Sequence, residues 1–203
     1  MALKKRLRVR RERNQRGAAL LELALIIPIF FILIALVLDI GLGYTDSRSS
    51  SSTARSAARI GALAGEDRLA DFRVLDAIRA QYGDGDDVEY IVIYRTDKGG
   101  NGIPSAGCLA GATGNDCNKY DGSILNGLSK SAFASVGNPE VCAPGSIDSD
   151  WCPTDRRSDA GSYLGVAIAT KNEAAVGLVG ADEYRFEDRA VFALYFAPLP
   201  TSN

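Results

Sequence analysis

The sequence contains no histidine. Histidine is the commonest general base in enzymes, so its absence excludes Ser-His and Cys-His nucleophile pairs. The chain also lacks a glycine-rich phosphate loop and a dinucleotide-binding fingerprint, and the paired acids Asp86 and Asp87 fall in a segment typical of a turn. We therefore expect a protein that is not an enzyme and that uses no cofactor.

Lysine and arginine are absent from residues 18–44 and crowded into the residues before them. Residues 1–16 carry a net charge of +7, whereas the rest of the chain carries −9. A basic tract can bind nucleic acid, but one that abuts a hydrophobic segment is more simply the cytoplasmic flank of a membrane span. The sequence therefore predicts a membrane, and no nucleic acid, as a partner.

Residues 18–44 are long enough to cross a membrane once. As a helix they would measure about 40 Å, against about 30 Å for the hydrocarbon core of a bilayer. The strictly apolar part is shorter, so we expect Glu22 and Asp39 near the two interfaces, because ionised carboxylates are costly at the centre. The basic flank keeps the N-terminus cytoplasmic and predicts that residues 45–203 are exported.

Three kinds of cleaved signal compete with an anchor. A secretory signal needs a small-residue cleavage site just past the apolar core, and residues 40–44 supply a poor one. Arg10 and Arg11 lack the hydrophobic continuation of a twin-arginine signal, and no cysteine lies near the span to accept a lipid. The sequence favours a single-pass anchor in the inner (cytoplasmic) membrane.

The four cysteines all fall in the part of the chain expected to be exported. An even number of cysteines in a loop-rich stretch is typical of disulfides formed in an oxidising compartment. Three connectivities are open, and the short loops between them favour the sequential pairing, Cys108 with Cys117 and Cys142 with Cys152. A zinc site is the alternative, but no two cysteines have two-residue spacing and histidine is missing, so we expect no metal.

Small residues recur at helical spacing after the span, at positions 54, 57, 58, 61, 62 and 65. Such a stripe allows close approach of a partner surface, either the chain's own sheet, which is favoured, or another subunit. Residues 71–82 read as a second helix that ends at Gly83. Strands are expected at 88–95, 163–170 and 190–197, and the alternation of Tyr184 and Phe186 with charges predicts a fourth, half-exposed strand.

Helices followed by strands indicate an α+β fold, in which a long N-terminal transmembrane helix continues into an exported domain with a small, mainly antiparallel sheet. Residues 99–159 are rich in Gly, Ser, Asn, Asp and Pro and read as a loop region stapled by the disulfides. The expected organisation is a basic cytoplasmic leader (1–17), a transmembrane helix (18–44), a helix with the small-residue stripe (45–65) and an exported α+β domain (66–203) that contains the loop insert.

The junction between the leader and the span carries a recognisable motif. The run Arg16-Gly17-Ala18-Ala19-Leu20-Leu21-Glu22-Leu23 resembles the start of TadE-like proteins, the minor pilins or pseudopilins of the tight adherence (Flp, type IVc) pilus. Asp39-Ile40-Gly41 and the Ala57–Ala62 run are also similar to that family. The resemblance covers roughly residues 16–65, and it implies cleavage by a prepilin peptidase between Gly17 and Ala18 and a match of Glu22 to the family's glutamate.

Residue chemistry supports the same interpretation. Glycine before the scissile bond leaves the backbone accessible to an enzyme at the membrane surface. A carboxylate five residues into an apolar helix is costly in lipid and becomes favourable if it pairs with the new α-amino group on Ala18 of a neighbouring subunit, which would make Glu22 a registry residue in assembly. The alternative is that Glu22 only reaches the headgroups.

Two functions remain after these arguments. The first is a processed minor pilin or pseudopilin involved in pilus assembly, initiation or tip display. Its expected partners are the prepilin peptidase, other pilin subunits and the assembly platform, and its expected final location includes the extracellular pilus. The second is an uncleaved, single-pass membrane-anchored protein whose exported domain binds a ligand or serves as an assembly scaffold. The two predict different mature N-termini.

Overall fold

The computed structural model describes residues 2–97, 102–112, 114, 116–133, 142, 146–156, 162–173 and 183–194. Its first element is the helix α1 (Ala2–Ala64), whose side chains are described from Ala19 onward. The chain divides into two compact units, with the boundary inside α1 between Tyr44 and Thr45. The second unit, Thr45–Asn172 with Glu183–Asn203, is called the C-terminal domain below.

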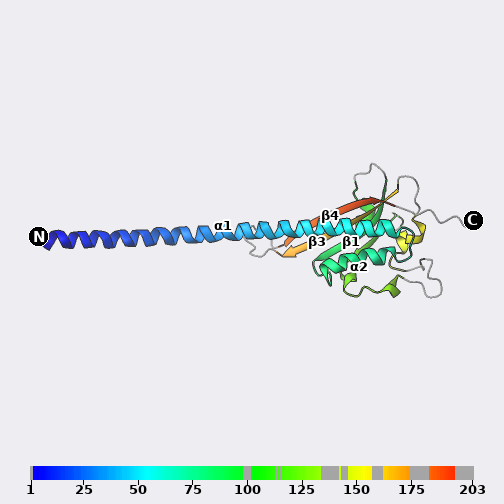
Figure 1. The fold of residues 1–203 in the computed structure, drawn as a ribbon, viewed down its shortest axis with the longest axis horizontal. Coiled ribbons are helices and arrows are strands. Elements are labelled where there is room, and N and C mark those ends of the chain that lie inside the picture. Colours follow the sequence, from blue (N-terminus) through cyan, green and yellow to red (C-terminus); the bar gives the residue numbers. More distant parts are fainter. Residues whose placement is uncertain are drawn as a thin grey trace, which may run out of the picture. The chain divides into compact units, whose positions relative to one another are not determined.

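The C-terminal domain contains two longer helices and four strands (Figure 1). The last turns of α1 are followed by α2 (Ala70–Tyr82), which ends at Gly83, where a positive φ of 60° stops the helix. The remaining elements are β1 (Val88–Asp97), α3 (Ala106–Ala110), β2 (Cys117–Asp121), η1 (Gly122–Leu125), η2 (Lys130–Ala132), η3 (Ser149–Trp151), η4 (Pro153–Asp155), β3 (Ser162–Glu173) and β4 (Glu183–Ala193).

The four strands form one antiparallel sheet in the order β2-β1-β3-β4. The central strand β1 pairs with both neighbours, so that Ile91 lies opposite Tyr120 of β2 and Ile168 of β3. The register shifts between Val88 and Tyr90, where a bulge interrupts the pairing of β1 with β3. A sheet of this kind must bury one face, because strands that alternate apolar and polar residues leave one side hydrophobic.

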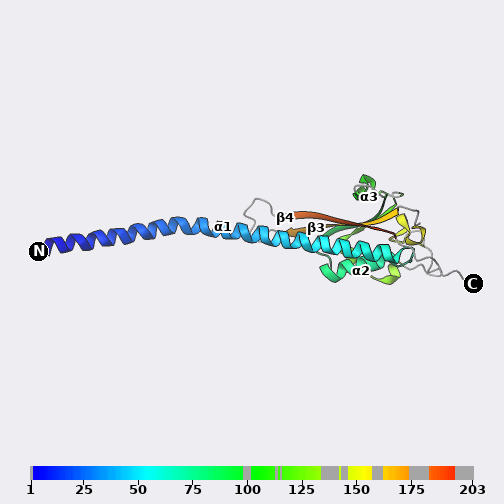
Figure 2. The ribbon, with the colours of Figure 1, turned by 45° about the horizontal axis from the view of Figure 1, so that its top comes forward.

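The inner face of the sheet packs on the two helices. Figures 1 and 2 show α2 running alongside the C-terminal part of α1, and the core between the helices and the sheet contains fully buried residues from all of these elements: Ala54, Ala57, Ala58, Val74, Leu75, Ile78, Ile91, Ile93, Leu164, Val166 and Ile168. A Cβ on Gly61 would lie 2.8 Å from Val74 Cγ2. The small-residue stripe of α1 is therefore what lets this helix approach the chain's own domain closely.

The outer face of the sheet is covered by a smaller layer. Val92, Tyr94 and Ala167 form a second buried cluster with the disulfide between Cys108 and Cys117, and Figure 2 shows α3 on the side of the sheet away from α1 and α2. Ser105 begins α3 by accepting a hydrogen bond from the Cys108 N–H. The second disulfide joins Cys142 to Cys152, so both bonds follow the sequential pairing.

The predicted fold class is confirmed, with two differences in the strands. The two separate strands expected around Tyr184 and in 190–197 are one continuous strand, β4, and residues 195–197 lie outside the described part of the chain. Conversely, β2 lies inside the segment expected to be loop. It is short and polar, and it forms because its backbone pairs with β1 and Cys117 is bonded to α3.

Candidate functional site

The residues of the junction motif lie on one continuous helix. Gly17, Ala18 and Glu22 all fall within α1, and the Glu22 side chain is exposed beside exposed Leu21 and Leu23. No ion pair joins Glu22 to the described part of the chain. Within the part of the chain whose side chains are described, this carboxylate has hydrophobic neighbours and no cationic partner, and in lipid such a carboxylate becomes favourable when it pairs with a cation.

The rest of α1 up to Tyr44 presents hydrophobic side chains to its surroundings. The helical stretch that begins at Ala19 contains an 18-residue window with a mean hydropathy of 3.0, only 6% of which is buried. Leu20, Phe31 and Val37 are each at least 65% exposed. In water this surface would be strongly unfavourable, and the stretch is long and apolar enough to span a membrane, as an anchor or a signal does.

A second site, which the sequence analysis missed, is a buried ion pair in the C-terminal domain. Asp71, in the first turn of α2, and Arg156, just after η4, are both fully buried, and Asp71 Oδ1 lies 2.5 Å from Arg156 Nη2. The guanidinium also stacks over the Trp151 ring, 4.2 Å from its centroid. Burying two charges is costly unless they are paired and hydrogen-bonded. The stability of this pair therefore depends on the hydrogen bonds that neighbouring residues make to it.

Two polar side chains of β2 complete the environment of Asp71. Asn118 Nδ2 and the Tyr120 hydroxyl each donate to Asp71 Oδ2 at 2.7 Å. Burial, together with the Asp71 charge, raises the pKa of the Tyr120 hydroxyl well above its usual range, so it remains protonated and able to donate. Asn118 also accepts from the Trp151 N–H and donates to the Trp151 carbonyl, which ties η3 to the sheet.

A second buried ion pair lies just before Trp151 in the sequence. Arg68, between α1 and α2, is paired with the fully buried Asp148, and Ser146 Oγ donates to Asp148 Oδ1 at 2.9 Å. Arg68 and Asp148 are 80 residues apart, so no local pattern in the sequence indicates their contact. Together with the Cys142–Cys152 bond, the two ion pairs fix residues 146–156, called the clamp segment below, against α2 and β2.

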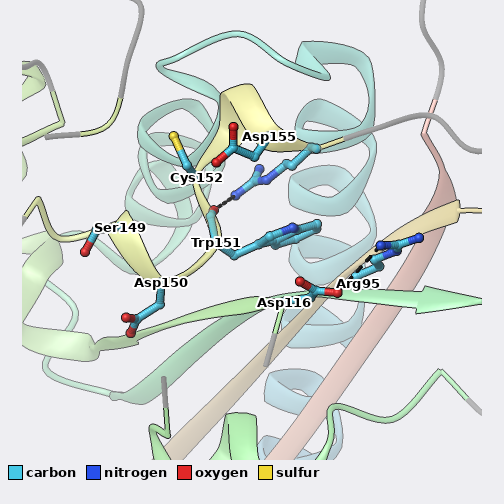
Figure 3. A pocket seen from close by; sticks show the side chains of 8 residues that line it. Arg95, Asp116, Ser149, Asp150, Trp151, Cys152 and Asp155 are labelled. Atoms are coloured by element: carbon cyan, nitrogen blue, oxygen red, sulfur yellow. Dashed lines mark hydrogen bonds and ion pairs between the residues drawn. The ribbon is translucent and has the colours of Figure 1, made fainter. Parts of the chain in front are cut away.

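The clamp segment borders a small polar cavity of about 180 Å³. Its lining, seen from close by in Figure 3, comes from Arg95, Asp116, Ser149, Asp150, Trp151, Cys152, Asp155 and Arg156. Arg95 and Asp116 face each other across an ion pair of 3.6 Å. Among the described residues, no three acidic or sulfur side chains are grouped so that they could hold a metal ion. The arrangement is that of a structural clamp with an open polar rim.

Comparison with known proteins bears on the N-terminal site. Residues 17–62 match the TadE family, described as TadE-like protein. The match begins at Gly17, runs through Glu22 and ends inside the small-residue stripe of α1. Members of the family are generally non-enzymatic pilus components. Neither the curated proteins nor the solved structures contain a match to this chain.

The TadE-like segment ends within the last turn of α1. It covers the apolar stretch of α1 and the stripe that packs on the domain, whereas α2, the sheet, both disulfides and the clamp segment lie beyond it. The predictions for Gly17, Ala18 and Glu22 therefore concern residues inside the TadE-like segment. The geometry of the clamp segment belongs to the part of the chain that the family match does not cover.

Proposed function

We propose that this chain is a minor pilin or pseudopilin of a tight adherence (type IVc) pilus. A prepilin peptidase removes the basic leader between Gly17 and Ala18, and the freed apolar helix packs with other pilin subunits during assembly. The observation that carries the proposal is the TadE-like match, which starts at the glycine before the expected scissile bond. The exposed apolar surface of α1 supports it, because that surface requires lipid or neighbouring helices to cover it.

The C-terminal domain fits a role outside the cytoplasm. Both disulfides lie in this domain, and such bonds persist in oxidising compartments. We infer that the basic flank stays cytoplasmic while the domain is exported, first on the inner membrane and then on the pilus. The alternative function is an uncleaved anchor whose exported domain acts as a binding or scaffold module.

Sequencing the N-terminus of protein isolated from membranes tests the proposal. We expect a mature chain that begins at Ala18 in cells with the prepilin peptidase and at Met1 when the peptidase gene is deleted. A Gly17→Leu variant should stay unprocessed, because a bulky residue at this position obstructs access to the backbone, and Gly41→Leu provides a matched change beyond the junction, at a glycine with open space around it. Recovery of Met1 in peptidase-competent cells would rule out the processed pilin and leave the uncleaved anchor.

A further inference from the structure

The face of α1 turned away from the domain core carries two arginines. Arg55 and Arg59 are exposed and lie four residues apart, with the short exposed side chains of Ser52 and Ser56 beside them. No ion pair joins either arginine to the described part of the chain. This basic face, defined as Arg55 and Arg59, is therefore a charged surface without an anionic partner among the described residues.

A compact acidic surface lies elsewhere on the same domain. Asp84, Asp86 and Asp87 are exposed in the turn between α2 and β1, which is called the acidic turn below. The turn is rigid: Gly85 donates to the Tyr82 carbonyl and accepts from the Val88 N–H, and a Cβ on Gly85 would lie 2.6 Å from the Gly122 carbonyl oxygen. A rigid charged surface loses little conformational entropy when it binds.

The acidic turn and the basic face lie at different levels along α1. Gln81 donates to Ser49 Oγ at 3.0 Å, and Asn172 donates to Asp46 Oδ2 at 2.9 Å. Lys171 donates its N–H to the Asp87 carbonyl, so the acidic turn lies level with residues 46–49. At 1.5 Å per residue, the basic face lies about 10–20 Å further along the helix.

The charge of Asp46 adds to the acidic turn at that level. Burial raises the pKa of the Tyr82 hydroxyl, and Asp188, Asp46 and Asp87 each contribute to the rise through their charges. These carboxylates therefore lie around one hydroxyl at the end of α2. The exposed cations Arg48 and Lys171 lie at the same level and offset part of this negative charge. The carboxylates there still outnumber them, so the net charge is negative at the level of residues 46–49 and positive at Arg55 and Arg59.

We propose that the basic face of one copy docks on the acidic turn of a second copy of this chain, displaced by about 10–20 Å along the α1 axis. The proposal rests on the proposed function, since it assigns the contact between subunits. The two surfaces are different, so each copy uses one surface toward each neighbour. A contact of this heterologous kind does not close a dimer and leads to rings or open helical filaments.

Charge and geometry together favour a second copy over the other occupants. Parallel copies at the same height would bring their arginines level with each other, which is repulsive, whereas the axial displacement brings opposite charges together. An antiparallel pair would also match the charges, but copies anchored in one membrane share a direction.

Cross-linking between two differently tagged full-length copies tests the contact. One copy carries Arg59→Cys and the other carries Asp86→Cys, and a short bismaleimide is added to membranes that hold both. We expect a cross-linked pair of the two tags, with a yield about tenfold higher than that of a control in which Arg185→Cys, an exposed arginine on β4, replaces Arg59→Cys. Equal yields in the two combinations would overturn the proposal.

Charge reversal gives a second measurement that leaves the disulfides untouched. Arg55→Glu with Arg59→Glu in both tagged copies should lower their co-purification about tenfold, and adding Asp86→Lys with Asp87→Lys to both copies should restore it. Arg185→Glu is the matched control and should change little. An unaltered co-purification of the reversed chain, or a failure of the second reversal to restore it, would contradict docking between these surfaces.

The outcomes separate this inference from the proposed function and from lipid binding. If the chain begins at Ala18 and enters pili but gives no specific cross-link, the docking is disproved and the pilin assignment stands. If chains that keep Met1 give a specific cross-link, the docking stands and the processed pilin is disproved. Reconstitution into phosphatidylcholine vesicles addresses the lipid. A cross-link that persists there supports docking of copies, and one that needs added phosphatidylglycerol overturns it.

Discussion

Asp71 lies at the centre of a buried network of hydrogen bonds and an ion pair in the C-terminal domain. It accepts hydrogen bonds from Asn118 and Tyr120 and pairs with Arg156. All four side chains are buried, so their polar atoms depend on partners within the protein. Arg156 Nε and Nη1 have no hydrogen-bond partner among the described residues. A buried pair of this kind adds little stability over a well-packed apolar pair, but loss of one partner leaves the other charge buried and uncompensated.

The first prediction concerns the loss of that carboxylate. Asp71→Ala should lower the free energy of unfolding by about 3–5 kcal/mol, because it leaves the Arg156 charge buried without a counterion. The measurement is guanidinium unfolding of the full chain in detergent, followed by the emission of Trp151, the only tryptophan.

Two variants make the Asp71 prediction specific. Asp76→Ala removes an exposed carboxylate from the same helix and should change the free energy of unfolding by less than about 0.5 kcal/mol. The double variant Asp71→Leu with Arg156→Met should recover much of the loss, since both buried charges are removed together. If Asp71→Ala and Asp76→Ala have equal effects, the buried pair does not organise the segment.

At the scale of elements, the two disulfides stabilise different layers. Cys108–Cys117 joins α3 to β2 on the outer face of the sheet, and Cys142–Cys152 anchors the clamp segment. Each closes a loop of about ten residues, so the two bonds constrain the unfolded chain to a similar extent. Their removal should therefore have similar energetic effects and different structural effects.

The emission of Trp151 distinguishes the two bonds. Cys142→Ser with Cys152→Ser should lower the free energy of unfolding by about 2–3 kcal/mol and shift the emission to longer wavelength, because the clamp segment loosens around a ring that is 6% exposed. Cys108→Ser with Cys117→Ser should cost a comparable amount and leave the emission in place. An equal shift in both variants would contradict the assignment of the bonds to separate layers.

The elements that could be predicted from the sequence are those with a strong local pattern. The periodic apolar positions of α2 and the Val- and Ile-rich runs of β1 and β3 are correctly placed. In contrast, β2 contains Asn118 and Lys119 in a run of five residues and has no local strand signal; its pairing partners determine its conformation. The ion pair of Arg68 and Asp148 could not be predicted either, because the two residues are 80 positions apart and such a contact leaves no periodic pattern in a single sequence.

At the scale of the whole molecule, one helix serves two environments. Before Tyr44 its side chains are apolar and exposed, and after Thr45 its small residues form part of the domain core, with Ala54, Ala57 and Ala58 at 0% exposure. The C-terminal domain therefore cannot release α1 without opening its own core.

Glu22 is the residue through which such packing can be tested in the intact assembly. Its carboxylate is costly among apolar side chains and becomes favourable next to the α-amino group that cleavage creates on Ala18 of a neighbour. Glu22→Ala should still be processed, since the scissile bond is unchanged, but its incorporation into pili should fall by about tenfold or more, because a close charge pair away from water is lost.

Glu22→Gln separates charge from shape, because it keeps the size of the side chain and removes the negative charge. If the ion pair to the new amine is what holds the subunit in register, Glu22→Gln should incorporate as poorly as Glu22→Ala, and Glu22→Asp should recover part of the yield. The measurement is the amount of tagged subunit in sheared pili relative to the amount in membranes. Normal incorporation of the Gln variant would mean that the carboxylate only reaches the headgroups, and the register of the subunits would then depend on apolar packing alone.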